Sequence, residues 1–157
     1  MAKDTSGRKV VVSNRKARHD YEIVSTFECG IALVGSEVKS LRAGQVQLKD
    51  GYGDVRDGEL WLYNAHIAPY GFARGGGHDP DRARKLLVHR REIDSLAGRI
   101  AQDGLTLVPL SIYFTHGLAK VEMALAKGIR RYDKRQKLKE REQKREMERA
   151  RAHRREY

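Results

Sequence analysis

Residues 52–67 read YGDVRDGELWLYNAHI and contain the strongest hairpin signal in the chain. Asp57-Gly58 supplies the positive φ angles that a two-residue type I′ turn needs. In the second arm, 59–67, Trp61 and Ile67 fall on one face of an alternating pattern and Leu60 falls on the other. The segment therefore predicts an antiparallel hairpin whose arms are 52–56 and 59–67.

Alternating apolar residues on either side of this hairpin predict further strands. Residues 21–27 alternate, Glu28-Cys29-Gly30 predicts a turn, and 31–34 predicts a second strand. Residues 45–48 predict a short strand, and 105–114 and 118–126 predict a second hairpin. In 105–114 the alternation places four apolar side chains on one face: Val108, Leu110, Ile112 and Phe114.

Two segments have helical signals with glycine stops. Residues 36–43 end at Gly44, and 89–102 show apolar residues at i, i+3, i+4 and i+7 before Asp103-Gly104. A mainly β chain of about six strands with two to three helices fits an OB-like closed antiparallel β-barrel, with a basic C-terminal tail. The predicted divisions are a flexible N-terminus at 1–9, the barrel at 10–128 and the tail at 129–157.

The tail, residues 129–157, holds 13 Lys or Arg and six Asp or Glu, and so accounts for +7 of the chain's net charge of +11. Its apolar residues do not recur at helical spacing, so it has no face to bury on a core. Pairs such as Glu142 and Arg145 favour a helix, but an isolated helix of this length is marginal. We expect the tail to be disordered in the free protein and helical against a polyanion.

The strongly basic composition, with a pI near 9.9, predicts an acidic partner, and nucleic acid is the first candidate. A membrane surface is disfavoured because the tail has no apolar face, and no apolar run approaches the length of a membrane span. The single cysteine, Cys29, excludes a disulfide framework and fits a reducing cytoplasm.

No pattern in the sequence predicts a catalytic centre, a cofactor or a metal site. The six histidines do not stand at ligand spacing, and one cysteine cannot anchor zinc. The chain has no nucleophile-elbow motif and no paired carboxylates. The candidate functional residues are instead basic clusters at 14–19, 39–42 and 82–85, with Lys120 and the tail, which can neutralise phosphates.

A co-linear set of motifs resembles the small protein B (SmpB) family, which binds transfer-messenger RNA (tmRNA). The motifs, in chain order, are NRKARHDY at 14–21, GSEVKSLRAG at 35–44, NAHIAPY at 64–70, Asp79-Pro80, RKLL at 84–87, GLAKVE at 117–122, AKG at 126–128 and YDKR at 132–135. The resemblance runs from about Val10 to the end of the sequence.

This resemblance implies an OB-like barrel that holds the tRNA-like domain of tmRNA and no catalytic activity. It also implies delivery, with elongation factor Tu, to the A site of stalled ribosomes for trans-translation. The tail is then expected to occupy the decoding centre of 16S rRNA and the empty mRNA channel.

The resemblance and the basic clusters together give two sets of candidate residues. The residues expected to bind RNA are Asn14, Arg15, Lys16, Arg18, His19, Glu28, Lys39, Arg42, Arg84, Lys85, Leu87 and Lys120. Those expected at the ribosome are Tyr132, Asp133, Lys134, Arg135, Lys137, Lys139 and Arg141. Among the first set, Leu87 is equally consistent with ordinary core packing.

Two alternative functions remain open from the residues alone. A generic single-strand nucleic-acid binder could use the same barrel and the same basic clusters. A nuclease is not excluded, although no residue pattern argues for one.

Overall fold

The computed structural model describes residues 8–70, 77–129 and 141–151. This part of the chain is mainly β, with nine strands and four helices. In chain order they are β1 (Lys9–Ser13), α1 (Arg15–Asp20), β2 (Tyr21–Ile31), α2 (Gly35–Arg42), β3 (Val46–Gln47), β4 (Tyr52–Arg56), β5 (Glu59–Tyr63), β6 (His66–Ile67), β7 (Arg84–Leu87), α3 (Arg90–Asp103), β8 (Thr106–Thr115), β9 (Leu118–Gly128) and a helix at 141–151.

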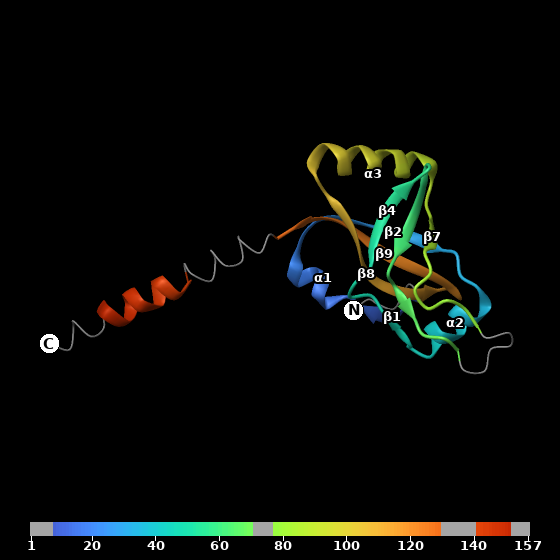
Figure 1. Cartoon of the computed structure of the whole chain (residues 1–157), viewed down its shortest axis with the longest axis horizontal. Coiled ribbons are helices and arrows are strands. Elements are labelled where there is room, and N and C mark those ends of the chain that lie inside the picture. The colour runs from blue at the N-terminus through green and yellow to red at the C-terminus, as the bar shows by residue number, and fades with distance from the viewer. Residues whose placement is uncertain (1–7, 71–76, 130–140, 152–157) are drawn as a thin grey trace.

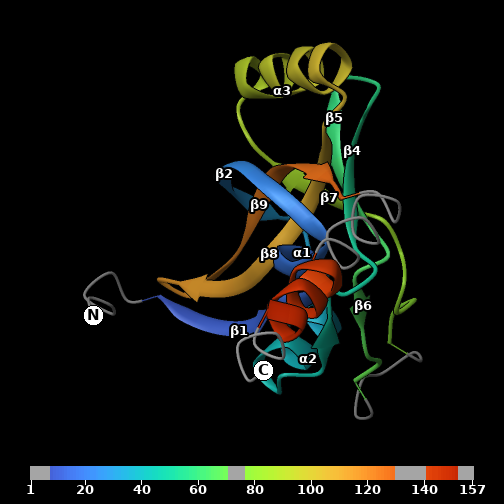
Figure 2. The same ribbon diagram turned by 90° about the vertical axis from the view of Figure 1, so that its left-hand side faces the viewer.

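Six of the strands form a closed ring of antiparallel pairs. The seven-stranded sheet has the order β1-β8-β4-β5-β7-β2-β9, and an additional pairing between β8 and β9 closes the six strands from β8 to β9 into the ring. β1 pairs with β8 outside this ring. Helices α3 and α2 lie at opposite ends of the strands (Figures 1 and 2). The β4–β8 contact depends on Gly53, since a Cβ there would lie 2.8 Å from Met123 Cε and 3.0 Å from Leu107 Cβ.

The two predicted hairpins form, and their turns have the expected geometry. Asp57 and Gly58 have φ angles of 52° and 74°, and β4 and β5 pair from Arg56–Glu59 to Tyr52–Tyr63. The arm predicted as one strand at 59–67 is interrupted at Asn64, whose φ is 59°. This left-handed residue reverses the alternation, so that Leu60 and Leu62 are buried before it and two other residues, Ala65 and Ile67, after it.

The turn predicted at Glu28-Cys29-Gly30 is wrong, because β2 continues through these residues to Ile31. Backbone pairing explains the difference. β9 pairs with β2 from Tyr21–Gly128 to Gly30–Lys120, and β7 pairs with Gly30 on its other side. Glycine here permits close approach of β7 instead of a reversal, and Glu28 consequently lies on a strand face.

The single apolar face predicted for residues 105–114 is also wrong. The register of β8 shifts between Pro109 and Ser111, which reverses the alternation midway along the strand. Ile112 and Phe114 pack in the main core, whereas Val108 and Leu110 pack in a second cluster that includes Ala17 of α1. The bulge therefore gives β8 buried residues on both faces, and α1 packs against the second cluster.

The helices follow the predicted stops. α2 is followed by Gly44 with φ of 73°, and α3 ends at Gly104 with φ of 64°. The basic cluster at 14–19 lies on α1 (Arg15–Asp20) and its N-cap, Asn14. In the tail, the described residues 141–151 are helical and every side chain is exposed.

Candidate nucleic-acid interface

Three of the candidate residues, Glu28, Leu87 and Lys120, meet in one groove although they come from β2, β7 and β9. Gly30 is the register partner of both Leu87 and Lys120, which places these side chains on either side of β2. The resulting groove, here called the Glu28 groove, has a volume of about 470 Å³ and is lined by Glu28, Gly30, Leu87, Val88, His89, Glu92 and Lys120.

The carboxylate of Glu28 is held between two donors. Lys120 Nζ lies 3.9 Å from Glu28 Oε1, and the Tyr113 hydroxyl donates to Glu28 Oε2. Burial, reinforced by the bond to Glu28, raises the pKa of Tyr113, so the phenol remains a donor at neutral pH. The tyrosine hydroxyl thus fixes one oxygen of the Glu28 carboxylate, and Lys120 places a positive charge at the groove.

Leu87 is an exposed apolar residue, with 52% of its surface accessible. A Cβ at Gly30 would come within 3.2 Å of Leu87 Cβ, so the glycine leaves room for this side chain beside β2. Core packing is therefore not its role, and its apolar surface is available to a ligand.

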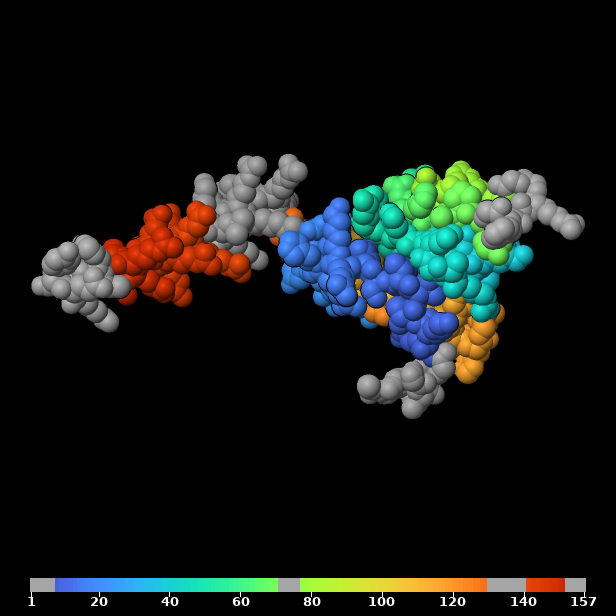
Figure 3. Space-filling view, turned by 90° about the horizontal axis from the view of Figure 1, so that it is seen from below, coloured from blue at the N-terminus to red at the C-terminus, as the bar shows by residue number. Residues whose placement is uncertain are grey.

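Glu122 connects the Glu28 groove with the basic residues of α1. It is the register partner of Glu28 across β2 and β9, and Arg8 and Arg18 lie 3.0 and 3.8 Å from its carboxylate oxygens. The Arg8 guanidinium also lies 3.6 Å from the centre of the Tyr113 ring. In Figure 3 β1 and α1, both blue, share one surface with the end of the β8–β9 hairpin beside β1.

Asn14 is buried and acts as the anchor of α1. Its Oδ1 accepts from the amide of Ala17, and its Nδ2 donates to the carbonyls of Leu48 and Pro109 at 3.1 and 2.9 Å. These bonds use both hydrogens of the side-chain amide, and the residue is 4% exposed, so the main role of Asn14 is structural. What it positions is the exposed basic surface of α1, formed by Arg15, Lys16, Arg18 and His19.

Arg84 is also fully buried, and its guanidinium lies 2.6 Å from Glu37 Oε2. Arg82 binds Glu37 Oε1 at 2.5 Å. Burial opposes the charge of Glu37, but hydrogen bonds from Arg82, the Val34 amide and Arg84 outweigh it and hold the pKa of Glu37 below its usual range. This cluster fixes α2 against β7. Because Arg84 is buried, it can influence ligand binding only by positioning the exposed residues beside it.

The candidate cations of β7 and α2 other than Arg84 lie outside the Glu28 groove. Lys85 Nζ lies 3.2 Å from Glu59 Oε1. On α2, Lys39 lies 5.5 Å from the Tyr70 ring centre and Arg42 lies 4.7 Å from that of Phe114. The predicted basic clusters are therefore several separate surfaces, and only Lys120 stands in the groove.

Comparison with known proteins identifies the family. A family model described as SmpB protein matches residues 11–153. The chain belongs to the SmpB family.

Relatives in this family match nearly the full sequence. An SsrA-binding protein from Acidothermus cellulolyticus is 58% identical over 145 residues, which cover 92% of this chain and 91% of the relative. One from Nostoc sp. is 54% identical over 152 residues, covering 96% and 97%. A solved structure described as "tmRNA-SmpB: a journey to the center of the bacterial ribosome" aligns with a TM-score of 0.66 at 52% identity, over 79% of this chain and 91% of that one.

Several candidates of the tail fall outside the described residues. They are Tyr132, Asp133, Lys134, Arg135, Lys137 and Lys139. Arg141 is described and begins the exposed helical segment.

Sequence reasoning missed Tyr113, Glu122 and Gly30. The position of Tyr113 could have been inferred from the turn. If His116 and Gly117 form a two-residue loop, Thr115 pairs with Leu118 and Tyr113 pairs with Lys120. No local pattern indicates Glu122, because its partners Arg8 and Arg18 precede it by a hundred residues or more.

The described residues give no indication of metal or thiol chemistry. Across 8–70, 77–129 and 141–151, no group of three or more His, Cys, Asp or Glu is placed to hold a metal ion. Burial, followed by the charges of Glu92 and Glu28, raises the pKa of Cys29 to about 12, so the thiol stays protonated. None of the helices in this part of the chain is long and apolar enough to cross a membrane.

Proposed function

We propose that this protein binds the tRNA-like domain of tmRNA and delivers it to the A site of stalled ribosomes for trans-translation. The observation that supports this most directly is the meeting of Glu28, Leu87 and Lys120 in one groove, in a chain that belongs to the SmpB family. The solved family structure is described as a tmRNA–SmpB complex in the bacterial ribosome.

In the Glu28 groove each side chain has a distinct task. Lys120 neutralises a phosphate, and Leu87 offers apolar contact to a base or sugar. Glu28 cannot attract phosphate, but its carboxylate accepts hydrogen bonds from a base amino group or a ribose 2′-hydroxyl. Arg15, Lys16, Arg18 and His19 of α1 extend the basic surface, and Lys39, Arg42 and Lys85 contribute at a distance from the groove.

Two of the candidates act indirectly in this proposal. Asn14 sets the position of α1, and Arg84 sets the position of β7 immediately before Lys85 and Leu87. The six-stranded ring on which these residues stand is an OB-like closed barrel, an architecture that presents loops and a strand face to nucleic acids.

The tail supplies the contact with the ribosome. Tyr132 to Arg135 dock at the decoding centre, with Tyr132 stacking on a base, and Lys137, Lys139 and Arg141 follow the 16S rRNA along the empty mRNA channel. Elongation factor Tu accompanies the complex, which acts in the cytoplasm. The protein is an RNA-binding adaptor in this account and catalyses no reaction.

An affinity comparison at fixed salt tests the proposal. The full-length protein should bind the folded tRNA-like domain far more tightly than an unstructured single strand of equal length. Equal affinities would favour a generic single-strand binder, and magnesium-dependent breakdown of the RNA by pure protein would favour a nuclease.

A further inference from the structure

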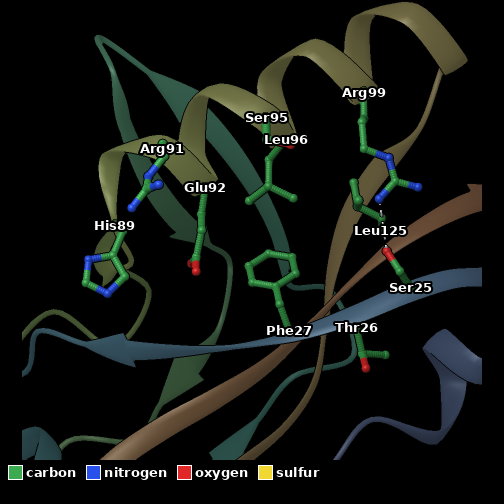
Figure 4. Close-up of a pocket in the computed structure, with 10 residues that line it drawn as sticks. All are labelled: Ser25, Thr26, Phe27, His89, Arg91, Glu92, Ser95, Leu96, Arg99 and Leu125. Atoms are coloured by element: carbon green, nitrogen blue, oxygen red, sulfur yellow. Dashed lines mark hydrogen bonds between the residues drawn. The ribbon is translucent and has the colours of Figure 1, made fainter.

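A second groove lies between α3 and β2, next to the Glu28 groove (Figure 4). It has a volume of about 590 Å³, within the range of sites that bind small molecules or single nucleotides. We call it the α3 groove. Glu28, Leu87 and Lys120, the proposed RNA contacts of the Glu28 groove, do not line it.

The floor of the α3 groove is apolar and includes an aromatic ring. Phe27 of β2 projects toward α3, below the side chain of Leu96, and Leu125 of β9 lies beside it (Figure 4). Phe27 is only partly buried and packs on the edge of the core. A partly exposed ring of this kind is a platform on which a nucleobase can stack.

The rim of the groove is polar and carries cations. Arg91 and Arg99 are exposed residues of α3 that line it, and Arg99 Nη1 lies 3.4 Å from Ser25 Oγ. Glu92 projects into the space beside Phe27 (Figure 4). Arginine binds phosphate oxygens, and a carboxylate accepts from the amino group of a base.

The α3 groove and the Glu28 groove share part of their wall. His89 and Glu92 line both, so a chain bound at Lys120 and Leu87 can continue directly onto Phe27. Apolar floor, cationic rim and this continuity together fit one occupant, an unpaired nucleotide of the same RNA.

We propose that the α3 groove takes one unpaired base of the bound RNA, stacked on Phe27 with its amino edge toward Glu92 and its phosphates at Arg91 and Arg99. This inference rests on the proposed function, because the RNA is the one held in the Glu28 groove. The α3 groove would recognise an unpaired base, whereas Lys120 in the Glu28 groove would contact a phosphate.

Base-specific chemical probing of the tRNA-like domain, free and bound to the full-length protein, tests this site. The wild-type protein should protect one unpaired base from modification, and Phe27→Leu, which keeps apolar volume but removes the ring, should restore its reactivity. The same substitution should weaken binding about 5- to 100-fold, the loss expected for one stacked base. Thermal melts establish that the variant is folded.

Two arginines of α3 provide a second, matched comparison. Arg99→Gln should weaken binding about 3- to 10-fold and lower the salt slope by about one. Arg90→Gln, the same change on the same helix at a residue that does not line the groove, should have little effect.

The outcomes separate this inference from the function on which it rests. Tight binding with no protected unpaired base, or with protection that survives Phe27→Leu, overturns the inference alone. Protection confined to paired segments also overturns it. Failure of the wild-type protein to bind the tRNA-like domain overturns the proposed function and the inference with it.

Discussion

The hydroxyl of Tyr113 donates a hydrogen bond to Glu28, although β9 lies between the strands that carry them. The hydrogen bond therefore spans β9 and holds Oε2 of Glu28, while Lys120 Nζ lies 3.9 Å from Oε1. Tyr113 is almost completely buried, so its role at the groove is to position Glu28.

Replacing Tyr113 with phenylalanine should weaken binding of the tRNA-like domain about 3- to 10-fold, because Glu28 is released toward Lys120 and neutralises it. Stability should fall by about 1 kcal/mol, the usual contribution of one hydrogen bond. Titration of fluorescent RNA at several salt concentrations measures the effect. Tyr63→Phe, at a tyrosine stacked on Tyr52, is the control. Unchanged affinity in Tyr113→Phe would show that Glu28 needs no fixed orientation.

Lys120→Ala should raise the Kd about 3- to 10-fold and lower the slope of log K against log salt by about one, because one phosphate contact is lost. The ring should remain folded, since the Lys120 side chain is partly exposed. Lys127→Ala removes the same charge from an exposed position on the same strand and should matter less. Equal losses in the two variants would indicate that only total charge is important.

Leu87→Ala should reduce RNA affinity while leaving the melting temperature within about 2 °C, because an exposed side chain contributes little to the core. Leu118 is similarly exposed, at 63%, and lies outside the Glu28 groove. Leu118→Ala should therefore leave binding intact. A large loss of stability in Leu87→Ala would mean that Leu87 packs in the core after all.

Glu37→Gln should destabilise the fold by about 3–5 kcal/mol at pH 7, because it leaves the buried Arg84 without its counter-charge. The pKa of Glu37 is lowered in the folded state, so its contribution is present above the unfolded pKa of about 4.3. That contribution disappears as the pH falls through the folded pKa. Urea unfolding between pH 7 and pH 3 measures this effect. The difference in the free energy of unfolding between wild type and variant should shrink as the pH falls.

Glu59→Gln is the control for this experiment. Glu59 pairs with Lys85 at 3.2 Å on a partly exposed surface, and such pairs contribute at most about 1 kcal/mol. A constant gap between wild type and Glu37→Gln across the pH range would contradict the assigned ionisation of Glu37.

A chain that ends at Ile129 should still bind the tRNA-like domain but should not support tagging of peptides on stalled ribosomes. The shortened chain keeps the hydrogen bond from the Ile129 amide to Asp20, which closes the last strand. Its reduced charge should weaken binding to unrelated RNA more than binding to the tRNA-like domain. Loss of all binding would contradict the division of tasks between ring and tail.

The features that could be predicted from sequence are those determined by neighbouring residues. Asp57-Gly58, Gly44 and Gly104 each adopt the positive φ expected of them, since glycine and aspartate tolerate that conformation locally. The alternation of short segments likewise predicted the strands of both hairpins.

The features that sequence could not supply depend on distant partners. The Glu28-Cys29-Gly30 segment is extended because β9 and β7 pair with it, and the bulge in β8 is set by its neighbours in the sheet. Asn14 and Arg84 resemble surface polar residues in sequence, yet their partners, Pro109 and Glu37, lie far along the chain. The sequence also could not distinguish RNA contact from core packing for Leu87, because a short apolar run does not indicate which side chain faces outward.

The joining of β9 to both β2 and β8 has a consequence for biosynthesis. Tyr21 pairs with Gly128, so the ring cannot close until the last strand has been translated, and until then two neighbouring strands present unpaired edges. Folds dominated by such distant pairings take milliseconds to seconds to form. The exposed edges of β2 and β8 are covered only when β9 pairs with both, so closure of the ring is a late step in the synthesis of this chain.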